Sequence, residues 1–279
     1  MRPIDIHECH RLLLDMAAIL DRVCRENAIP YYMLGGTMLG AVRHGGFIPW
    51  DDDMDFGIPR DHFDRLTHLL TDALRGTPYR LHTYHNSPNK INYLKMVDTR
   101  TCIRGAWETT DTGVNIDLFP LDPIPEDPSA FSRQARSTWL WGRLLFLHGT
   151  PTPEVDLPFP VKQLAGAIMH LIHWGLRAAR VKPITLERRW ERAARRYEGS
   201  GSTRLGDFST RDPAHWSASL DELFPAQRVP FEDTTVMTAR DFDTILTRHY
   251  GDYMQLPPED QRVNHEASTV ILGPHAPRS

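Results

Sequence analysis

Four aspartates within five positions constrain this chain more than any other feature. The stretch "PWDDDMDFG" covers residues 49–57 and places carboxylates at positions 51, 52, 53 and 55. Two like charges about 4 Å apart repel by roughly 4 kcal/mol at an effective dielectric of about 20. A divalent cation relieves such crowding, and ligands that are all oxygen favour Mg²⁺, Mn²⁺ or Ca²⁺ over zinc. The stretch therefore predicts a divalent-cation site.

The residues that precede and contain the cluster predict a turn, a helix and a strand. Residues 35–45, "GGTMLGAVRHG", are typical of a glycine turn that enters a helix, and Thr37 is the expected N-cap. Residues 51–58, "DDDMDFGI", are expected to follow as a strand. Side chains at i and i+2 share a face of a strand. The first, third and fifth residues of this strand, all aspartates, are therefore expected to point in one direction.

Calcium in an EF-hand loop is one interpretation, because Asp51, Asp53 and Asp55 occupy the first, third and fifth ligand positions. It fails because Phe56 stands where the loop needs glycine, and His62 stands where it needs a bidentate glutamate. We therefore do not expect calcium binding of this kind.

A DxD motif of metal-dependent, nucleotide-sugar glycosyltransferases is a second interpretation, and Asp53-Met54-Asp55 would satisfy it. Such enzymes usually place a long series of βα units ahead of the motif. Only 52 residues precede Asp53 in this chain. The glycosyltransferase is therefore disfavoured, but it stays open as an alternative.

A nucleotidyltransferase of the DNA polymerase beta type accounts for more of the chain. Such an enzyme needs a glycine turn into a helix, Asp-x-Asp on the next strand and a third carboxylate on a later strand. The sequence supplies Gly35 and Gly36, then Asp53 and Asp55, and then Asp117 in "VNIDLFPLD". Backbone N–H groups of the turn can bind phosphate oxygens, and the carboxylates can hold Mg²⁺ or Mn²⁺ beside them.

The order of the expected elements predicts an α+β fold, with a small mixed sheet flanked by helices. We expect a catalytic core over residues 1–125 and a mainly helical insertion over 126–215, which is a candidate acceptor-binding region. Residues 216–279 are expected to pack back on the core. For residues 161–180, apolar with a basic end, we expect a buried insertion helix in preference to one that contacts a membrane surface.

Composition excludes some partners and indicates a compartment. The formal net charge is −4 and no basic tract is present, so we expect no nucleic-acid partner. The three cysteines form no CxxC pair, and the N-terminus lacks the pattern of a signal peptide. These features favour the cytoplasm.

Three stretches resemble the LicD family, which includes phosphorylcholine transferases and, more distantly, fukutin-type ribitol-phosphate transferases. They are "GGTMLGAVRHGGFIPWDDDMDFGIPRD", "VNIDLFPLDPIP" and "YGDYMQLPPEDQR". The resemblance implies a nucleotidyltransferase-like fold and the metal-dependent transfer of a phospho-alcohol, above all phosphocholine. CDP-choline would be the donor and CMP the leaving group. The acceptor would be a hydroxyl of a glycan or lipid-linked glycan, as in lipopolysaccharide biosynthesis at the inner face of the membrane.

The resemblance also implies roles for individual residues. Asp53, Asp55 and Asp117 would hold the metal and carry catalysis, and Asp117 is the alternative acceptor of the hydroxyl proton. Contacts to the donor phosphates would come from the glycine turn, namely Gly35, Gly36 and Thr37.

Further charged residues extend this set of candidates. Arg43, followed by His44, is a candidate phosphate clamp because guanidinium pairs with phosphate oxygens, although a surface cation is an equal alternative. Lys95 in "INYLKMVDTR" is expected on a strand near the site, where it could neutralise a phosphate, although a strand-edge lysine that extends to solvent is an alternative. Asp51 and Asp52 are expected to support the metal ligands from outside.

The identity of the transferred group stays open at this point. Aromatic faces bind quaternary ammonium groups, and the candidates are Tyr31, Tyr32, Trp50, Trp107, Trp139 and Trp141. Scattered aromatic residues are more often part of a core. Transfer of ribitol phosphate or glycerol phosphate by the same mechanism remains an alternative, as does a non-catalytic nucleotide-binding module.

Overall fold

The computed structural model describes residues 2–83, 86, 91–103, 113–150, 158–262 and 270–272. Its helices and mixed sheet confirm the predicted α+β class. The helices are α1 (Ile6–Glu26), α2 (Gly35–His44), α3 (Arg60–Ala73), α4 (Pro128–Gly149), α5 (Val161–Ala178), α6 (Pro183–Ala194), α7 (Leu220–Leu223) and α8 (Phe242–Tyr250), with short 3-10 turns η1 (Arg195–Tyr197) and η2 (Glu259–Gln261).

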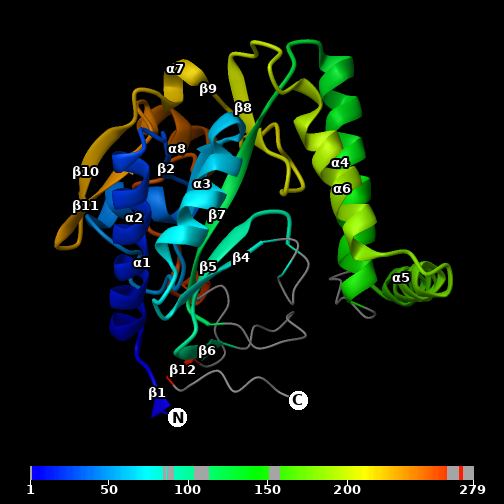
Figure 1. Ribbon diagram of the computed structural model, residues 1–279, viewed down its shortest axis with the longest axis horizontal. Coiled ribbons are helices and arrows are strands. Elements are labelled where there is room, and N and C mark those ends of the chain that lie inside the picture. Colours follow the sequence, from blue (N-terminus) through cyan, green and yellow to red (C-terminus); the bar gives the residue numbers. More distant parts are fainter. Residues whose placement is uncertain are drawn as a thin grey trace.

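The strands form one large sheet and two small ones (Figure 1). The large sheet contains β2 (Tyr32–Met33), β3 (Asp55–Pro59), β4 (Tyr79–His82), β5 (Leu94–Asp98), β7 (Asn115–Pro123), β8 (Arg204–Asp207) and β9 (Ala218–Ser219). A hairpin joins β10 (Gln227–Phe231) to β11 (Thr234–Thr238), and β1 (Arg2–Pro3), β12 (Val270–Leu272) and β6 (Thr101–Ile103) form the third sheet.

Strand β7 is the centre of the large sheet, because β3, β5 and β8 all pair with it. The β3–β7 pair is parallel and the other pairs are antiparallel. In this register Asp55 lies opposite Asp117, and Asp117 lies opposite Lys95 on β5. Three residues that are distant in sequence are therefore adjacent across three strands.

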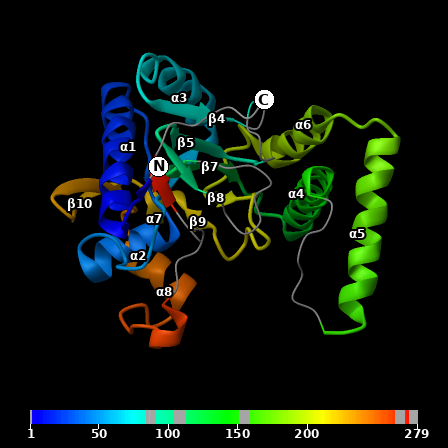
Figure 2. The same ribbon diagram turned by 90° about the horizontal axis from the view of Figure 1, so that it is seen from below.

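Helices α1 and α3 contact each other and pack against β7. In Figure 2, α3 lies on one side of strands β5 and β7, and α2 and α8 lie on the other. The apolar positions of α1 recur at helical spacing and are buried, including Leu13, Met16 and Leu20. A buried ion pair ties α3 to β7, with Arg60 Nε 2.7 Å from Asp122 Oδ1. Cys9 and Cys24 are free and buried in this core.

Helices α4, α5 and α6 form a helical arm beside the sheet (Figures 1 and 2). Helix α4 packs along α6, and α5 contacts α4 at the outer end of the arm. His173 is the one buried residue of α5. The expectation of a buried insertion helix is therefore wrong, because a single neighbouring helix covers only one side of α5.

Residues 204–207, within the range expected to be mainly helical, form β8 and extend the large sheet antiparallel to β7. The range 126–215 thus supplies a strand as well as the helical arm. No helix in the described ranges is long and apolar enough to cross a membrane.

Candidate active site

The turn between β2 and α2 differs in detail from its prediction. Helix α2 has Leu34 as its N-cap, so Thr37 lies inside the first turn and is not the cap. The Thr37 hydroxyl instead accepts a hydrogen bond of 2.8 Å from the backbone N–H of Asp55, and Leu34 N–H donates to the Asp55 carbonyl at 2.9 Å. These two bonds fix the start of α2 to the start of β3.

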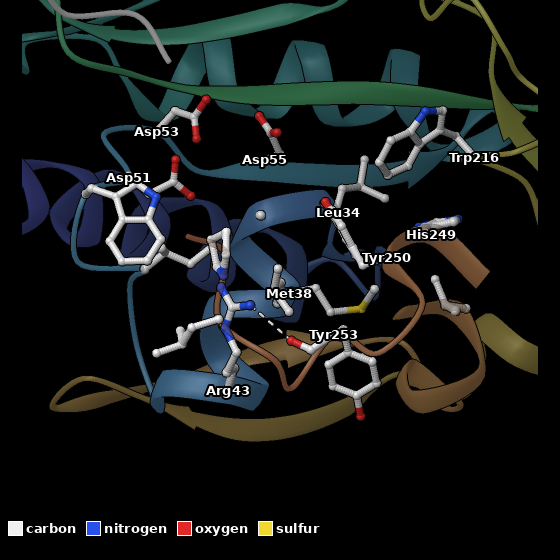
Figure 3. Close-up of a pocket in the computed structure, with 18 of the residues that line it drawn as sticks. Leu34, Met38, Arg43, Asp51, Asp53, Asp55, Trp216, His249, Tyr250 and Tyr253 are labelled. Carbon is white, nitrogen blue, oxygen red and sulfur yellow. Dashed lines mark hydrogen bonds between the residues drawn. The ribbon is translucent and has the colours of Figure 1, made fainter. Parts of the chain in front are cut away.

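Strand β3 begins at Asp55, so the preceding aspartates lie in the loop that leads into it and not on the strand as expected. Asp51, Asp53 and Asp55 nevertheless line one pocket of about 910 Å³, and Asp52 does not. Figure 3 shows these three carboxylates around one space in front of α2. The alternation predicted for a strand thus holds in an extended loop.

Two glycines allow the helix to approach the carboxylates. Gly35 has a φ of 47°, a backbone conformation that favours glycine. A Cβ on Gly36 would lie 2.9 Å from Asp51 Oδ2, closer than real contacts allow. Helix N-termini present free backbone N–H groups and a partial positive charge. The glycine turn therefore brings the N-terminus of a helix, with its partial positive charge, up to a cluster of carboxylates.

Asp117 and Lys95 reach the cluster from the next two strands without lining the pocket. One Asp117 oxygen accepts from Asn115 Nδ2 at 2.8 Å, and the other lies 3.4 Å from Lys95 Nζ. Both side chains are buried, so this ammonium is a fixed part of the cluster. The structure thus brings Lys95 to the site where the sequence predicted it, whereas Asn115 was missed because a lone asparagine carries no signal.

The electrostatics of Asp55 indicate an excess of negative charge. Burial raises the pKa of Asp55 well above its ordinary value, and the charges of Asp53, Asp117 and Asp51 raise it further. Lys95 acts in the opposite direction. Carboxylate oxygens are the donors that Mg²⁺ and Mn²⁺ prefer. Within the described ranges, however, no three carboxylate, imidazole or thiol groups already form a metal site.

Arg43 and His44 differ in their relation to the pocket. Arg43 lines it, but its Nη1 donates to the backbone carbonyls of Tyr253 at 3.0 Å and Gln255 at 3.4 Å. The guanidinium therefore ties the segment after α8 to α2, as the dashed line in Figure 3 shows. His44 is exposed, accepts from Arg43 Nε at 3.0 Å and is not part of the pocket lining.

An aromatic wall, formed by Trp216, His249 and Tyr250, faces the carboxylates across the pocket (Figure 3). The ring centroids of Trp216 and His249 are 4.5 Å apart, and those of Trp216 and Tyr250 are 6.1 Å apart. Burial raises the pKa of Tyr250, and the nearby charges of Asp55, Asp51 and Asp53 raise it further. The Tyr250 phenol is therefore neutral and close to the carboxylates.

The wall is uncharged at neutral pH. Burial, with the neighbouring His215 and Arg248, lowers the pKa of His249 to about 4. Neither ring nitrogen of His249 has a hydrogen-bond partner among the described residues. Asp207 also lines the pocket, and burial raises the pKa of this carboxyl to about 6. The pocket thus pairs neutral rings with carboxylates.

The remaining aromatic candidates divide between pocket, core and surface. Trp50 and Tyr32 line the pocket, Tyr31 is buried in the core, and Trp139 is exposed on α4. Arg262 places its guanidinium 5.6 Å from the centre of the Trp50 ring. Trp141 lies under Arg189 in the helical arm. Trp107 lies outside the described residues.

Sequence reasoning missed the aromatic wall. Tyr250 and His249 lie at the end of α8, and Trp216 lies before β9, with no spacing pattern that joins them to the aspartates. The available signal was the resemblance of "YGDYMQLPPEDQR", which begins at Tyr250, to a recurrent stretch of a known family.

The comparison with protein families matches the part of the chain that contains the glycine turn and the cluster. Residues 28–144 match the model described as LicD/FKTN/FKRP, nucleotidyltransferase domain. The chain carries a LicD-family domain. This domain includes α2, β3, β5 and β7, and therefore all the carboxylates of the cluster. Helices α5, α6 and α8 lie outside the matched range.

Relatives of this chain include one that aligns over nearly its full length. The lipopolysaccharide cholinephosphotransferase LicD of Haemophilus influenzae is 25% identical over 284 residues, which cover 98% of this chain and all of that protein. The human ribitol 5-phosphate transferase FKRP is 44% identical over 50 residues, covering 18% of this chain and 10% of that protein. An uncharacterized protein of Rickettsia prowazekii is 49% identical over 45 residues, covering 16% and 17%.

Proposed function

We propose that this protein is a phosphotransferase that moves phosphocholine from CDP-choline to a hydroxyl of a glycan or lipid-linked glycan. The observation that carries the proposal is the carboxylate cluster in front of the N-terminus of α2, inside a LicD-family domain. The similarity to a cholinephosphotransferase along 98% of the chain supports the same class of reaction.

We assign the metal to the carboxylate cluster. Asp53 and Asp55, together with Asp117 on the neighbouring strand, would hold Mg²⁺ or Mn²⁺. The bound cation would offset the negative charge of the donor phosphates. Asp51 and Asp52 support the ligands through the loop, where the Asp51 carbonyl lies 2.8 Å from His10 Nε2.

The protein's own groups would bind and orient the donor. Backbone N–H groups of Gly35 and Gly36 at the start of α2 are the proposed phosphate contacts, as helix N-termini favour anions. Thr37 holds the Asp55 backbone in place, and Lys95 fixes Asp117. Arg43 positions the segment after α8 and adds positive charge to the pocket.

The reaction would be a displacement at phosphorus. The acceptor hydroxyl oxygen forms a bond to the phosphorus that carries choline, and the bond from that phosphorus to the CMP oxygen breaks. The hydroxyl proton passes to a carboxylate of the cluster, and CMP departs with the electron pair. Positioning and charge compensation supply most of the rate enhancement in reactions of this kind.

The aromatic wall favours choline as the transferred alcohol. A quaternary ammonium group cannot donate hydrogen bonds, and it is bound by aromatic faces and nearby negative charge. Trp216 and Tyr250 supply the rings, and the neutral His249 adds no repulsion. Ribitol phosphate is the second candidate, because 50 residues of the chain resemble a ribitol 5-phosphate transferase.

The test is release of CMP from CDP-choline, CDP-ribitol and CDP-glycerol, with UDP- and GDP-sugars as controls, in the presence and absence of Mg²⁺. We expect Mg²⁺-dependent release of CMP from CDP-choline with a glycan acceptor. Asp53→Asn should lower this rate at least about a hundredfold, because charge compensation at the phosphates is lost. Asp72→Asn, an exposed aspartate on α3, is the matched control and should leave the rate unchanged.

Each of the other outcomes would indicate a different function. Release of CMP from CDP-ribitol alone would assign the second candidate, and hydrolysis of a sugar nucleotide would identify a DxD glycosyltransferase. Binding of CDP-choline by calorimetry without turnover on any acceptor tested would favour a non-catalytic module. Equal activity of Asp53→Asn and wild type would remove the cluster from the reaction.

A further inference from the structure

The outer side of α5 exposes large apolar side chains that nothing in the described part of the chain covers. Leu171 is 74% exposed, Leu164 is 65% exposed and Trp174 is 60% exposed. Phe159, just before the helix, is 77% exposed. Single exposed apolar residues are ordinary, but a contiguous set marks an interaction surface.

These side chains form one stripe because of their spacing. Apolar residues recur every three or four positions and therefore lie on one side of a helix. We call this stripe the α5 face, and it consists of Val161, Leu164, Ile168, Leu171 and Trp174. The other side of the helix is anchored to α4, where His173 Nδ1 lies 2.7 Å from the Leu147 carbonyl. The α5 face therefore points away from the rest of the arm.

Within the part of the chain that the structure describes, the charged residues of α4, of α5 and of the segment directly after α5 all have one sign. Residues 128–150 and 158–186 contain no acidic residue, in a chain whose formal net charge is −4. The same ranges contain seven cationic residues: Arg133, Arg136, Arg143, Lys162, Arg177, Arg180 and Lys182. All seven are exposed. Helices α4 and α5 thus combine an exposed apolar stripe with exposed cations.

We propose that the helical arm binds the surface of an anionic lipid bilayer through the α5 face. A helix with an apolar stripe, an aromatic residue and flanking basic residues lies in the membrane interface, where anionic lipids attract its cations. A second copy of the chain fits less well, because pairing two arms would bring the same cationic residues against each other. The proposal does not depend on the function assigned to the pocket.

The arrangement of the molecule is compatible with this contact. Both views show α5 at the outer end of the arm, on the far side of the molecule from α2 and α8 (Figures 1 and 2). Residues of α2 and α8 line the pocket. A bilayer on the α5 face would therefore leave the pocket uncovered.

The test is co-sedimentation of the full chain with phosphatidylcholine vesicles, with and without about one-third phosphatidylglycerol. The variant Leu164→Glu/Leu171→Glu places two carboxylates on the α5 face. Leu220→Glu, at an exposed leucine in α7, is the matched control for an added charge. Far-UV circular dichroism verifies that each variant is folded, and light scattering reports oligomeric state.

We expect the wild type and Leu220→Glu to bind anionic vesicles, and the double variant to bind about tenfold less or weaker still. Binding should also weaken as salt is raised, and be poor on phosphatidylcholine alone. Equal binding of the double variant, or no binding of the wild type, would overturn the proposal. A dimer that the double variant disrupts, without vesicle binding, would overturn it in favour of a second copy.

Discussion

The central sheet buries its apolar residues, whereas the helical arm exposes a set of large apolar side chains. Strand β7 is covered on its apolar positions, and Ile116, Leu118 and Leu121 are at most 1% exposed. Helix α5 has a single buried residue. The sheet therefore buries its apolar side chains, whereas the arm leaves the apolar α5 face exposed to solvent.

The difference reflects whether a region has to keep charged side chains close together. Close carboxylates keep their positions only if the backbone under them is fixed, and strand pairing from both sides fixes Asp117 between Asp55 and Lys95. Helix α5 contains no carboxylates that have to be kept close together. Its exposed surface is available for a partner, and its mutation should cost little stability. Four measurements test this contrast, in order of decreasing expected effect.

Arg60→Ala should destabilise the core most. It would leave the carboxylate of Asp122 buried without its bidentate partner, whose two contacts are 2.7 and 2.8 Å. Loss of one partner of a buried ion pair costs about 3–5 kcal/mol. Urea unfolding measures the change. Arg75→Ala, which removes an exposed ion pair to Asp72, should cost at most about 1 kcal/mol, and equal effects would contradict the prediction.

Two leucine truncations compare core and arm directly. Leu66 on α3 is fully buried, and Leu171 on α5 is 74% exposed. Leu66→Ala should lower the free energy of unfolding by about 2–5 kcal/mol, because a cavity remains. Leu171→Ala should change it by less than about 0.5 kcal/mol. A large effect at Leu171 would mean that the α5 face is covered in the isolated protein.

Asp207 should make the core sensitive to pH. Burial raises its pKa from 3.8 to about 6, so the folded state binds its proton more tightly than the unfolded chain does. The stability that the folded state gains from binding this proton more tightly is fully present below about pH 4 and is lost as pH rises through about 6.

Asp207→Asn should therefore gain stability relative to wild type, by about 2–3 kcal/mol between pH 4 and pH 7. Denaturant unfolding of both proteins across this range measures the difference. A constant difference at every pH would show that Asp207 does not titrate as described.

Trp216→Leu should have the smallest effect and should act on one substrate. Loss of a cation–π contact of about 0.5–2 kcal/mol should raise KM for CDP-choline roughly 2- to 30-fold. KM for CDP-ribitol should stay unchanged. Trp139→Leu, which alters an exposed tryptophan of the arm, serves as the control. An equal rise for both donors would remove Trp216 from choline recognition.

Much of the core could be predicted from local patterns. The apolar spacing of α1 and the prolines that close β7 each depend on neighbouring residues, and the structure contains both elements. Thr37 shows the limit of such reasoning. Its position after a glycine turn suggested an N-cap, but its hydroxyl accepts a hydrogen bond from Asp55, 18 residues later.

Long-range contacts decided the surroundings of the carboxylates. Arg43 donates to carbonyls more than 200 positions away, so it holds the segment after α8 in place. Trp216 and His249 become neighbours because β9 and α8 pack on the same side of the pocket. No spacing along the chain encodes either contact.

The sequence by itself determined the fold class, the glycine turn, the aspartates and the resemblance to the LicD family, because these depend on short stretches of chain. Tertiary structure alone decided the aromatic wall and the exposure of α5. A helix has the same periodicity whether its apolar side is covered or open. Only the packing of α4 against one side of α5 shows that the other side faces solvent.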